Sequence, residues 1–416
     1  MKRFASAALA AILVLSSVAL SGCNGDPFKG GNGVRTGTVQ SGQEDQSSAP
    51  GESSKVEPSD IKNIESKPEI TSEQITQLKD MLNTYKEIPG FNNGATSIDA
   101  KSISEGKKVT FIADNMNNTF TNLVASQFVK TVKTVGFAGA TADESDGTPA
   151  FYNEQLEAAQ TDSDIVIMYG DINKDVVGGS IERVQAHGKK VISVGNMGNE
   201  NKDHYVDYTI PINYQLTGKL MADWAVAQTS AKVNALAINN SDSTLSSAIY
   251  NGFAEEFKTY VTSGYCTVLS GSSIEIGNGL TEKIMNAIKN DSNLNYIIVL
   301  DEGMIADTVS AVEQSGKKIS VLGTGGGKDA LGAAESGKVE MLVAQSYEWT
   351  AYATIDYALR VLNKSELPEL QDVPVRIVDA ELIKKEMADS SYDADGFYEI
   401  CFGSSFITGY NQIWGL

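Results

Sequence analysis

The sequence predicts an α/β protein with two doubly wound parallel-sheet lobes. Short apolar runs rich in β-forming residues, such as 109–113 and 165–169, are typical of buried strands. Polar loops and segments with apolar residues at helical spacing follow them. This alternation starts near residue 107 and begins again near residue 234. Alternating strands and helices are typical of a parallel sheet covered on both faces, so we expect two such sheets.

The first strand, at 109–113, precedes a polar loop at 114–120 and a helix with an apolar face. The apolar face is formed by Val124, Phe128, Val132 and Val135. Ligands of open α/β sheets bind beyond the carboxyl ends of the strands, so the loop is expected to lie at a ligand site.

The later elements repeat this unit. Further strands are predicted at 165–169, 190–194, 205–210, 234–239, 265–269, 296–300, 319–323, 341–344 and 375–378. Helices are predicted near 176–187, after the polar loop at 240–244 as far as about 259, and at 280–289, 305–314, 329–336 and 347–362.

The N-terminus has the features of an export signal. Lys2 and Arg3 precede an apolar run from 4 to 20, which is short for a transmembrane anchor of about 20 residues. The sequence Leu20-Ser21-Gly22-Cys23 follows, and it resembles the lipobox of bacterial lipoproteins. The resemblance implies a signal peptide at 1–22, cleavage before Cys23, and a lipid anchor on its thiol.

Two further segments precede the first lobe. Residues 23–60 are mostly Gly, Ser, Gln, Asp and Glu, a composition that predicts a flexible tether. Residues 61–106 are expected to form an N-terminal helical extension, since Ile75, Leu78, Met81 and Leu82 suit one helix.

The composition excludes several functions. The net charge of -20 argues against nucleic-acid binding, which needs a basic surface. The sequence contains no HExxH, CxxC or GxSxG motif, and we expect no metal, no cofactor and no enzymatic activity. Besides Cys23, only Cys266 and Cys401 remain, and both a disulfide and two free thiols are compatible with an exported protein.

A glycine-rich segment at 323–328 invites comparison with the phosphate-binding P-loop. Leu322 stands where that motif needs its first glycine, and Asp329 stands where it needs Ser or Thr. We therefore expect a turn between a strand and a helix there.

From 107 to 387 the chain resembles type I, ribose-binding-like solute-binding lipoproteins of ABC sugar importers. The segment 118–121 occupies the place of the family's Asn-Pro-Phe-Phe segment, and Gly252-Phe253 is similar to a pair in the second lobe. The segment 301–304 resembles one where Asn or Asp meets a ligand hydroxyl, and Ala344-Gln345 resembles a crossing strand whose Gln faces the cleft.

The resemblance implies a three-crossover hinge, near 211–213, 345–347 and 374–377. Lobe 1 would comprise 107–211 with 347–374, and lobe 2 would comprise 212–346 with 375–416. The aromatic tail at 390–416 lies outside the family pattern, and either packs on a lobe or covers the cleft. Where members of this family usually have an Asp-Arg pair, this chain has Gly195-Asn196. Ile249 stands where they usually have an Arg, and Gly325 stands where they usually have an Asp.

The expected ligand-binding residues follow strand ends or crossovers. They are Asn118, Phe120, Asn196, Asn213, Asn239, Asp301, Gln345 and Tyr347. Structural roles compete with this interpretation: Asn118 and Asp301 also suit helix N-caps, and Phe120 suits a hydrophobic staple. Asn196 and Asn213 also suit turns, and Tyr347 suits the core.

Mainly neutral amides and one carboxylate suit an uncharged sugar or nucleoside-like ligand. The predicted function is therefore a lipid-anchored extracytoplasmic binding protein that serves an ABC permease in the cell membrane. One alternative is a solute sensor that signals to a membrane histidine kinase. Another is a secreted enzyme that uses Asp114 or Asp301.

Overall fold

The computed structural model describes residues 57–64, 67–92, 94–116, 118–142, 147–170, 172, 174–196, 205–368, 373–389 and 401–416. The side chains at 119, 120, 141, 142, 174, 175, 196, 211 and 244 are outside this description. The predicted signal peptide, Cys23 and nearly all of the predicted tether also lie outside the described residues.

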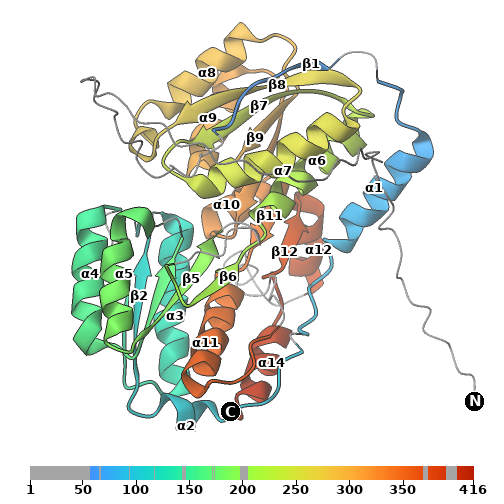
Figure 1. Ribbon diagram of the computed structural model, residues 1–416. Helices are drawn as coiled ribbons and strands as arrows, with labels where there is room; N and C mark the ends of the chain where they lie inside the picture. The colour runs from blue at the N-terminus through green and yellow to red at the C-terminus, as the bar shows by residue number, and fades with distance from the viewer. Residues whose placement is uncertain are drawn as a thin grey trace, which may run out of the picture. The chain divides into compact units, whose positions relative to one another are not determined.

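The first sheet is five-stranded and parallel, in the order β3-β2-β4-β5-β6. Its strands are β2 (Lys108–Ala113), β3 (Gly139–Ala142), β4 (Ile165–Tyr169), β5 (Lys190–Asn196) and β6 (Tyr208–Pro211). Its helices are α3 (Thr119–Val135), α4 (Pro149–Asp162), α5 (Lys174–Ala186) and α11 (Tyr347–Asn363). Figure 1 shows α4 and α5 on one face, with α3 and α11 on the other.

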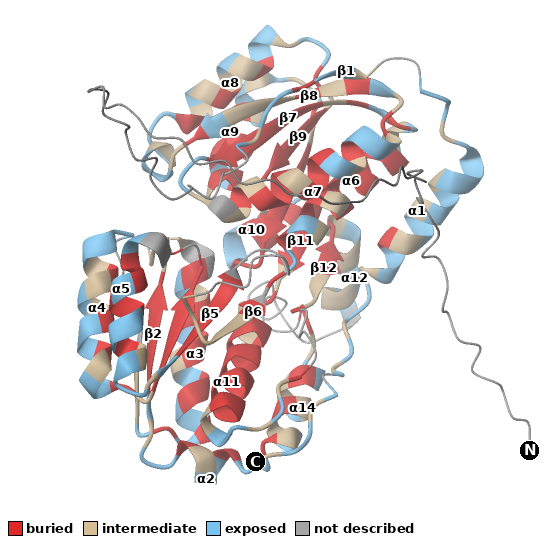
Figure 2. Ribbon diagram, in the orientation of Figure 1, coloured by how far each residue is buried: buried red, intermediate tan, exposed pale blue. Residues whose placement is uncertain are grey.

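Alternate residues of β2 explain why both faces are covered. Phe111 packs with Phe128 of α3, whereas Ile112 belongs to a separate cluster with Leu156 of α4 and Ile181 of α5. Successive side chains of a strand point to opposite faces, so an uninterrupted apolar strand needs a helix layer on each side. Figure 2 shows the buried residues concentrated in the strands and on the inner sides of the helices.

The second sheet is seven-stranded, in the order β1-β8-β7-β9-β10-β11-β12. Its strands are β7 (Lys232–Asn240), β8 (Ser263–Gly271), β9 (Tyr296–Val299), β10 (Ser320–Gly325) and β11 (Met341–Gln345), all parallel, with antiparallel edge strands β1 (Ile61–Ile64) and β12 (Val375–Val378). Its helices are α6 (Tyr214–Thr229), α7 (Thr244–Tyr260), α8 (Leu280–Asn290), α9 (Ile305–Ser315), α10 (Lys328–Glu335) and α12 (Ala380–Asp389), with 3-10 turns η1 (Ser273–Glu275) and η2 (Glu302–Met304).

The parallel strands of both sheets follow the same doubly wound order, second-first-third-fourth-fifth along the chain. This order places a topological switch point between β2 and β4 in one sheet and between β7 and β9 in the other. The predicted fold class, two doubly wound parallel sheets in one α/β chain, is confirmed.

The N-terminal extension contains more than the expected helix. Besides α1 (Ser72–Thr84) and α2 (Ala100–Ser104), it contributes β1, in which Ile61 pairs with Cys266 of β8. The sequence analysis also missed β3, α4, α6, α12 and α14 (Ser405–Ile413). Cys266 and Cys401 are both free and buried.

The C-terminal tail packs on α11. Trp414 stacks on Tyr352 with ring centroids 5.5 Å apart, and Phe406 stacks on Trp349 at 4.5 Å. The Nε1 of Trp414 donates to the Asp356 carboxylate at 2.8 Å. Because α11 also packs on α3, α14 lies with the first sheet, whereas the sequence analysis assigned 375–416 to the second lobe.

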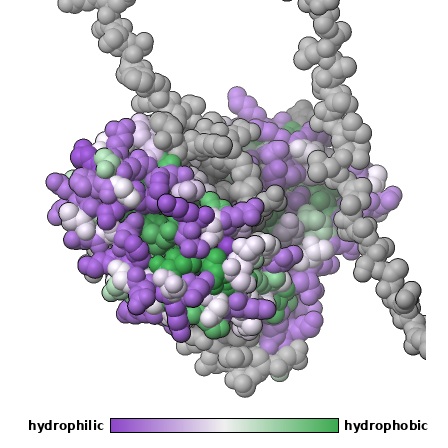
Figure 3. All heavy atoms as spheres, turned by 60° about the horizontal axis from the view of Figure 1, so that its bottom comes forward, coloured by the Kyte–Doolittle hydropathy of each residue, from purple (hydrophilic) through white to green (hydrophobic). Residues whose placement is uncertain are grey.

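The face drawn in Figure 3 is mostly hydrophilic, with hydrophobic residues gathered in one region. Among the described residues, no helix is both long and apolar enough to span a membrane.

Trp414→Ala should lower the free energy of unfolding by about 3–5 kcal/mol, because it opens a cavity and leaves Asp356 without one donor. Urea unfolding followed by circular dichroism would measure this loss. Leu416→Ala is the control, since Leu416 is 40% exposed and its truncation should change little. Equal small losses in both variants would contradict a structural role for the tail.

Candidate ligand-binding site

One pocket lies where the carboxyl ends of strands from both sheets converge. Its lining comprises Asn118, Thr121, Tyr169, Tyr214, Ser243, Leu245, Ile249, Leu300, Asp301, Glu302, Thr324, Gly325 and Gln345. Asn118 follows β2, Tyr169 ends β4, and Asp301 lies just beyond β9. These are the strands beside the two switch points, where open α/β sheets bind ligands. The cavity volume is about 50 Å³, below the roughly 300–1,000 Å³ of typical ligand pockets.

Asn118 has both of the roles that its sequence position suggested. Its Oδ1 accepts a hydrogen bond from the backbone N–H of Thr121 at 3.0 Å and so caps α3. The residue also lines the pocket. The cap fixes where Asn118 lies relative to the end of β2.

Asp301 is likewise a cap and a pocket residue. One carboxylate oxygen accepts from the Gly303 N–H at 2.9 Å, and the other accepts from Asn240 Nδ2 at 2.9 Å. Burial raises the pKa of Asp301, while these two hydrogen bonds oppose the rise. Both oxygens keep a lone pair for a ligand donor.

Gln345 ends β11, at the point where the chain crosses to α11. Its Nε2 donates to the Thr324 hydroxyl at 3.1 Å, which orients the amide beside the pocket. Thr324 in turn donates to the Val343 carbonyl at 3.2 Å. The expected amide at the crossing is therefore held in place by the neighbouring strand.

Glu302 explains the glycine-rich segment. Its carboxylate accepts hydrogen bonds from the backbone N–H groups of Gly326, at 3.1 Å, and Gly327, at 2.7 Å. A Cβ on Gly327 would lie 2.3 Å from Glu302 Oε1, and one on Gly325, whose φ is +138°, would lie 2.5 Å from the carboxylate. The turn is rich in glycine because it encloses a carboxylate of the protein itself. Burial raises the pKa of Glu302 to about 7.

Tyr169 and Tyr214 complete the site. Both side chains are buried, and among the described residues neither hydroxyl makes a hydrogen bond of normal geometry; the two interact only weakly with each other. The Tyr169 ring stacks on Phe111 at 5.6 Å, which fixes its orientation. Burial raises the pKa of both tyrosines above the usual value.

Three other candidates lie outside this pocket lining. Asn213 is exposed and caps α6, accepting from the Leu216 N–H at 3.1 Å. Asn239 is buried in β7, with Nδ2 at 3.5 Å from Ser270 Oγ. Tyr347 lines an adjacent small cavity with Cys401 and Phe402. The predicted roles of Phe120 and Asn196 concern side chains outside the described residues.

The sequence analysis did not single out Tyr169, Tyr214 and Glu302, which line the pocket. A positional signal existed for each, because Tyr169 ends a predicted strand, Tyr214 follows the first crossover, and Glu302 follows Asp301. A tyrosine at a strand end is as typical of the core as of a site, so position alone did not distinguish them.

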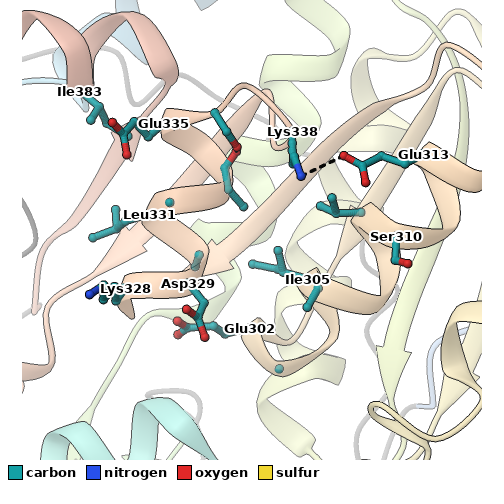
Figure 4. Close-up of a pocket in the computed structure, with 17 residues that line it drawn as sticks. Glu302, Ile305, Ser310, Glu313, Lys328, Asp329, Leu331, Glu335, Lys338 and Ile383 are labelled. Carbon is teal, nitrogen blue, oxygen red and sulfur yellow. Dashed lines mark hydrogen bonds and ion pairs between the residues drawn. The ribbon is translucent and has the colours of Figure 1, made fainter. Parts of the chain in front are cut away.

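A larger hollow, of about 690 Å³, lies between α9 and α10 (Figure 4). Its apolar lining includes Ile305, Leu331 and Ile383, and an ion pair of 3.0 Å joins Lys338 to Glu313 across it. Glu302 lines this hollow as well as the first pocket. Unlike this hollow, the first pocket brings together residues of both sheets.

The ionisable side chains of the pocket lining are carboxylates and phenols. Among its described lining residues there is no Lys, Arg or His. Within the described part of the chain, no group of three His, Cys, Asp or Glu side chains suits a metal ion.

Two sheets of the same parallel order, with a polar pocket at their carboxyl ends, are the arrangement expected of a two-lobed ligand-binding protein. The model of the periplasmic binding protein domain family matches residues 109–366. The chain belongs to this family. Its members bind substrates and are not enzymes, and membership implies an extracytoplasmic location. Comparison with curated protein sequences gives no match.

Solved structures share the fold at low sequence identity. A carbohydrate transporter from Acidothermus cellulolyticus 11B in complex with myo-inositol is 14% identical, with a TM-score of 0.58 over 72% of this chain and 99% of that one. An ABC transporter solute-binding protein from Agrobacterium vitis with bound D-fucose is 16% identical, with a TM-score of 0.58 over 68% and 98%. A glucose-galactose binding protein from Geobacillus stearothermophilus is 12% identical, with a TM-score of 0.58 over 66% and 98%.

Gly327→Ala should reduce the free energy of unfolding by about 1–3 kcal/mol, because the new Cβ displaces the Glu302 carboxylate from two N–H groups. Urea unfolding would measure the loss. Gly332→Ala in the same helix is the control, since its Cβ meets nothing within 4 Å and should stabilise the helix by roughly 0.5–1 kcal/mol.

The same pair of glycine variants in a Glu302→Ala background tests the cause. Without the carboxylate, Gly327→Ala should lower the free energy of unfolding by much less. An equal loss in both backgrounds would show that the clash with Glu302 is not responsible.

Proposed function

We propose that this protein is a lipid-anchored extracytoplasmic binding protein that captures a small neutral polyhydroxylated solute for an ABC importer. The observation that supports this most is a pocket lined by polar side chains from both sheets, with Asn118 on one side and Asp301 on the other. Family membership and the shared fold agree with it.

The lining favours an uncharged ligand rich in hydroxyl groups. Asp301 and Glu302 supply carboxylate acceptors, while Gln345, Thr324 and Asn118 supply amides and a hydroxyl. An anionic ligand would face these carboxylates with no counter-ion among the described lining residues. The similar proteins with bound myo-inositol and D-fucose handle ligands of this kind.

The small cavity supports a hinge mechanism. At about 50 Å³ it cannot hold a sugar, so a ligand enters only when the walls part. Closure then follows, because only a closed cleft lets one ligand contact both lobes. A sensor for a membrane histidine kinase would use the same site, and the comparisons favour transport over signalling.

Asn118→Ala and Gln345→Ala should each weaken binding about tenfold or more, since a broken buried hydrogen bond costs ~1–3 kcal/mol. A thermal-shift panel of D-glucose, D-galactose, D-fucose and myo-inositol would select the probe for calorimetry. Asn213→Ala is the matched control, because Asn213 also caps a helix but does not line the pocket. Unchanged affinity in both pocket variants would place the site elsewhere, and preference for an anionic ligand would refute the neutral site.

The lipid anchor is tested separately. Cys23→Ala should release the protein from the membrane fraction or block its processing, because the acylated thiol is lost. Fractionation of cells that express either the wild-type protein or the Cys23→Ala variant measures how much of each protein is in the membrane fraction. Exported wild-type protein that partitions into water would overturn the anchor and leave the binding function untouched.

A further inference from the structure

Tyr169 and Tyr214 carry a feature that folding alone does not explain. Their side chains are 1% and 3% exposed, and neither hydroxyl makes a hydrogen bond of normal geometry with the described residues. The interaction that they do make is a weak one with each other. Leaving a buried polar group unsatisfied is unfavourable, so such groups are uncommon in folded proteins. Both residues line the pocket, where a ligand would supply the missing partner.

The two phenols come from different parts of the chain. Tyr169 ends β4 of the first sheet, whereas Tyr214 begins α6, which packs on α7 beside the second sheet. Burial is the main reason that the pKa of each is raised, and Asp114 raises both further. The two phenols are close neighbours, since Tyr214 also raises the pKa of Tyr169 and the hydroxyls interact weakly with each other. Each phenol therefore keeps its proton at neutral pH and presents one donor and one acceptor.

We infer that Tyr169 and Tyr214 bind one hydroxyl group of the ligand between their phenol oxygens, and that this pair selects for ligands with a hydroxyl at that position. The inference rests on the proposed function and identifies the part of the ligand that is recognised. A ligand hydroxyl both donates and accepts, so it can accept from one phenol and donate to the other.

Other groups fit this position less well. A methyl or methylene group leaves both phenols unsatisfied, and sites built to bond a hydroxyl strongly reject the analogue without it. A carboxylate or phosphate would face the Asp301 carboxylate, with no Lys, Arg or His among the described lining residues to balance its charge. The pair therefore discriminates by hydroxyl position within the class of neutral sugars and polyols.

Tyr169→Phe and Tyr214→Phe test this on the full chain. Each removes an unsatisfied hydroxyl, so the Tm of the ligand-free protein should stay the same or rise. Affinity for the best of D-glucose, D-galactose, D-fucose and myo-inositol should fall about tenfold. Tyr357→Phe is the matched control, because its hydroxyl donates to the Pro368 carbonyl at 3.4 Å and does not line the pocket. Its affinity should be unchanged.

Mono-deoxy derivatives of the same probe provide the second arm. One derivative should bind wild type about tenfold more weakly than the parent sugar, yet bind the double variant Tyr169→Phe/Tyr214→Phe as well as the parent sugar does, because the ligand hydroxyl and both of its partners are then absent. D-galactose and D-fucose form one such pair, since they differ by a single hydroxyl.

The outcomes separate the two proposals. If wild type binds a probe but both tyrosine variants bind it equally well, the phenol pair is not the hydroxyl site and the proposed function stands. The pair is also overturned if the tyrosine variants lose affinity for the probe but every deoxy derivative binds wild type equally weakly, because no single ligand hydroxyl is then selected. If wild type binds none of the four probes, the proposed sugar-binding function itself fails.

Discussion

The buried guanidinium of Arg376 connects the N-terminal extension, α12 and the start of the C-terminal tail to the last crossover between the sheets. It lies on β12, where the chain returns from α11 to the second sheet, and it donates to the Lys86 carbonyl at 2.9 Å, to Glu386 and to the Cys401 carbonyl. The backbone of β12 adds a bond from Ile377 to Tyr85 at 2.8 Å. Since a buried charge requires all its partners, the extension, α12 and the start of the tail are fixed at this crossover together.

The site shows a contrast between satisfied and unsatisfied polar groups. Asn118, Asp301 and Glu302 are each held by backbone N–H groups, so their positions are set before any ligand arrives. Tyr169 and Tyr214 are held by packing, and their hydroxyls remain available. A pre-positioned shell with a few open hydrogen-bonding groups is how a binding pocket combines affinity with selectivity.

The sequence predicted the parallel strands well, because buried strands such as 165–169 are short apolar runs with few other interpretations. It did not predict β1, which is polar at its centre and depends on pairing with β8, or the polar helix α4. Within the site, Asn118, Asp301 and Gln345 followed from strand ends. The hydrogen bonds between the glycine-rich turn and Glu302 could not be predicted, because the turn follows β10 whereas Glu302 follows β9.

The carboxylate in the glycine-rich turn has a consequence for the environment of an exported protein. Phosphate and sulfate outside a cell compete for free backbone N–H groups at turns that precede helices. Here Gly326 and Gly327 already bond to Glu302, so these amides are saturated by the chain itself. These two N–H groups therefore have no free donor to offer an inorganic anion while the Glu302 carboxylate accepts from them.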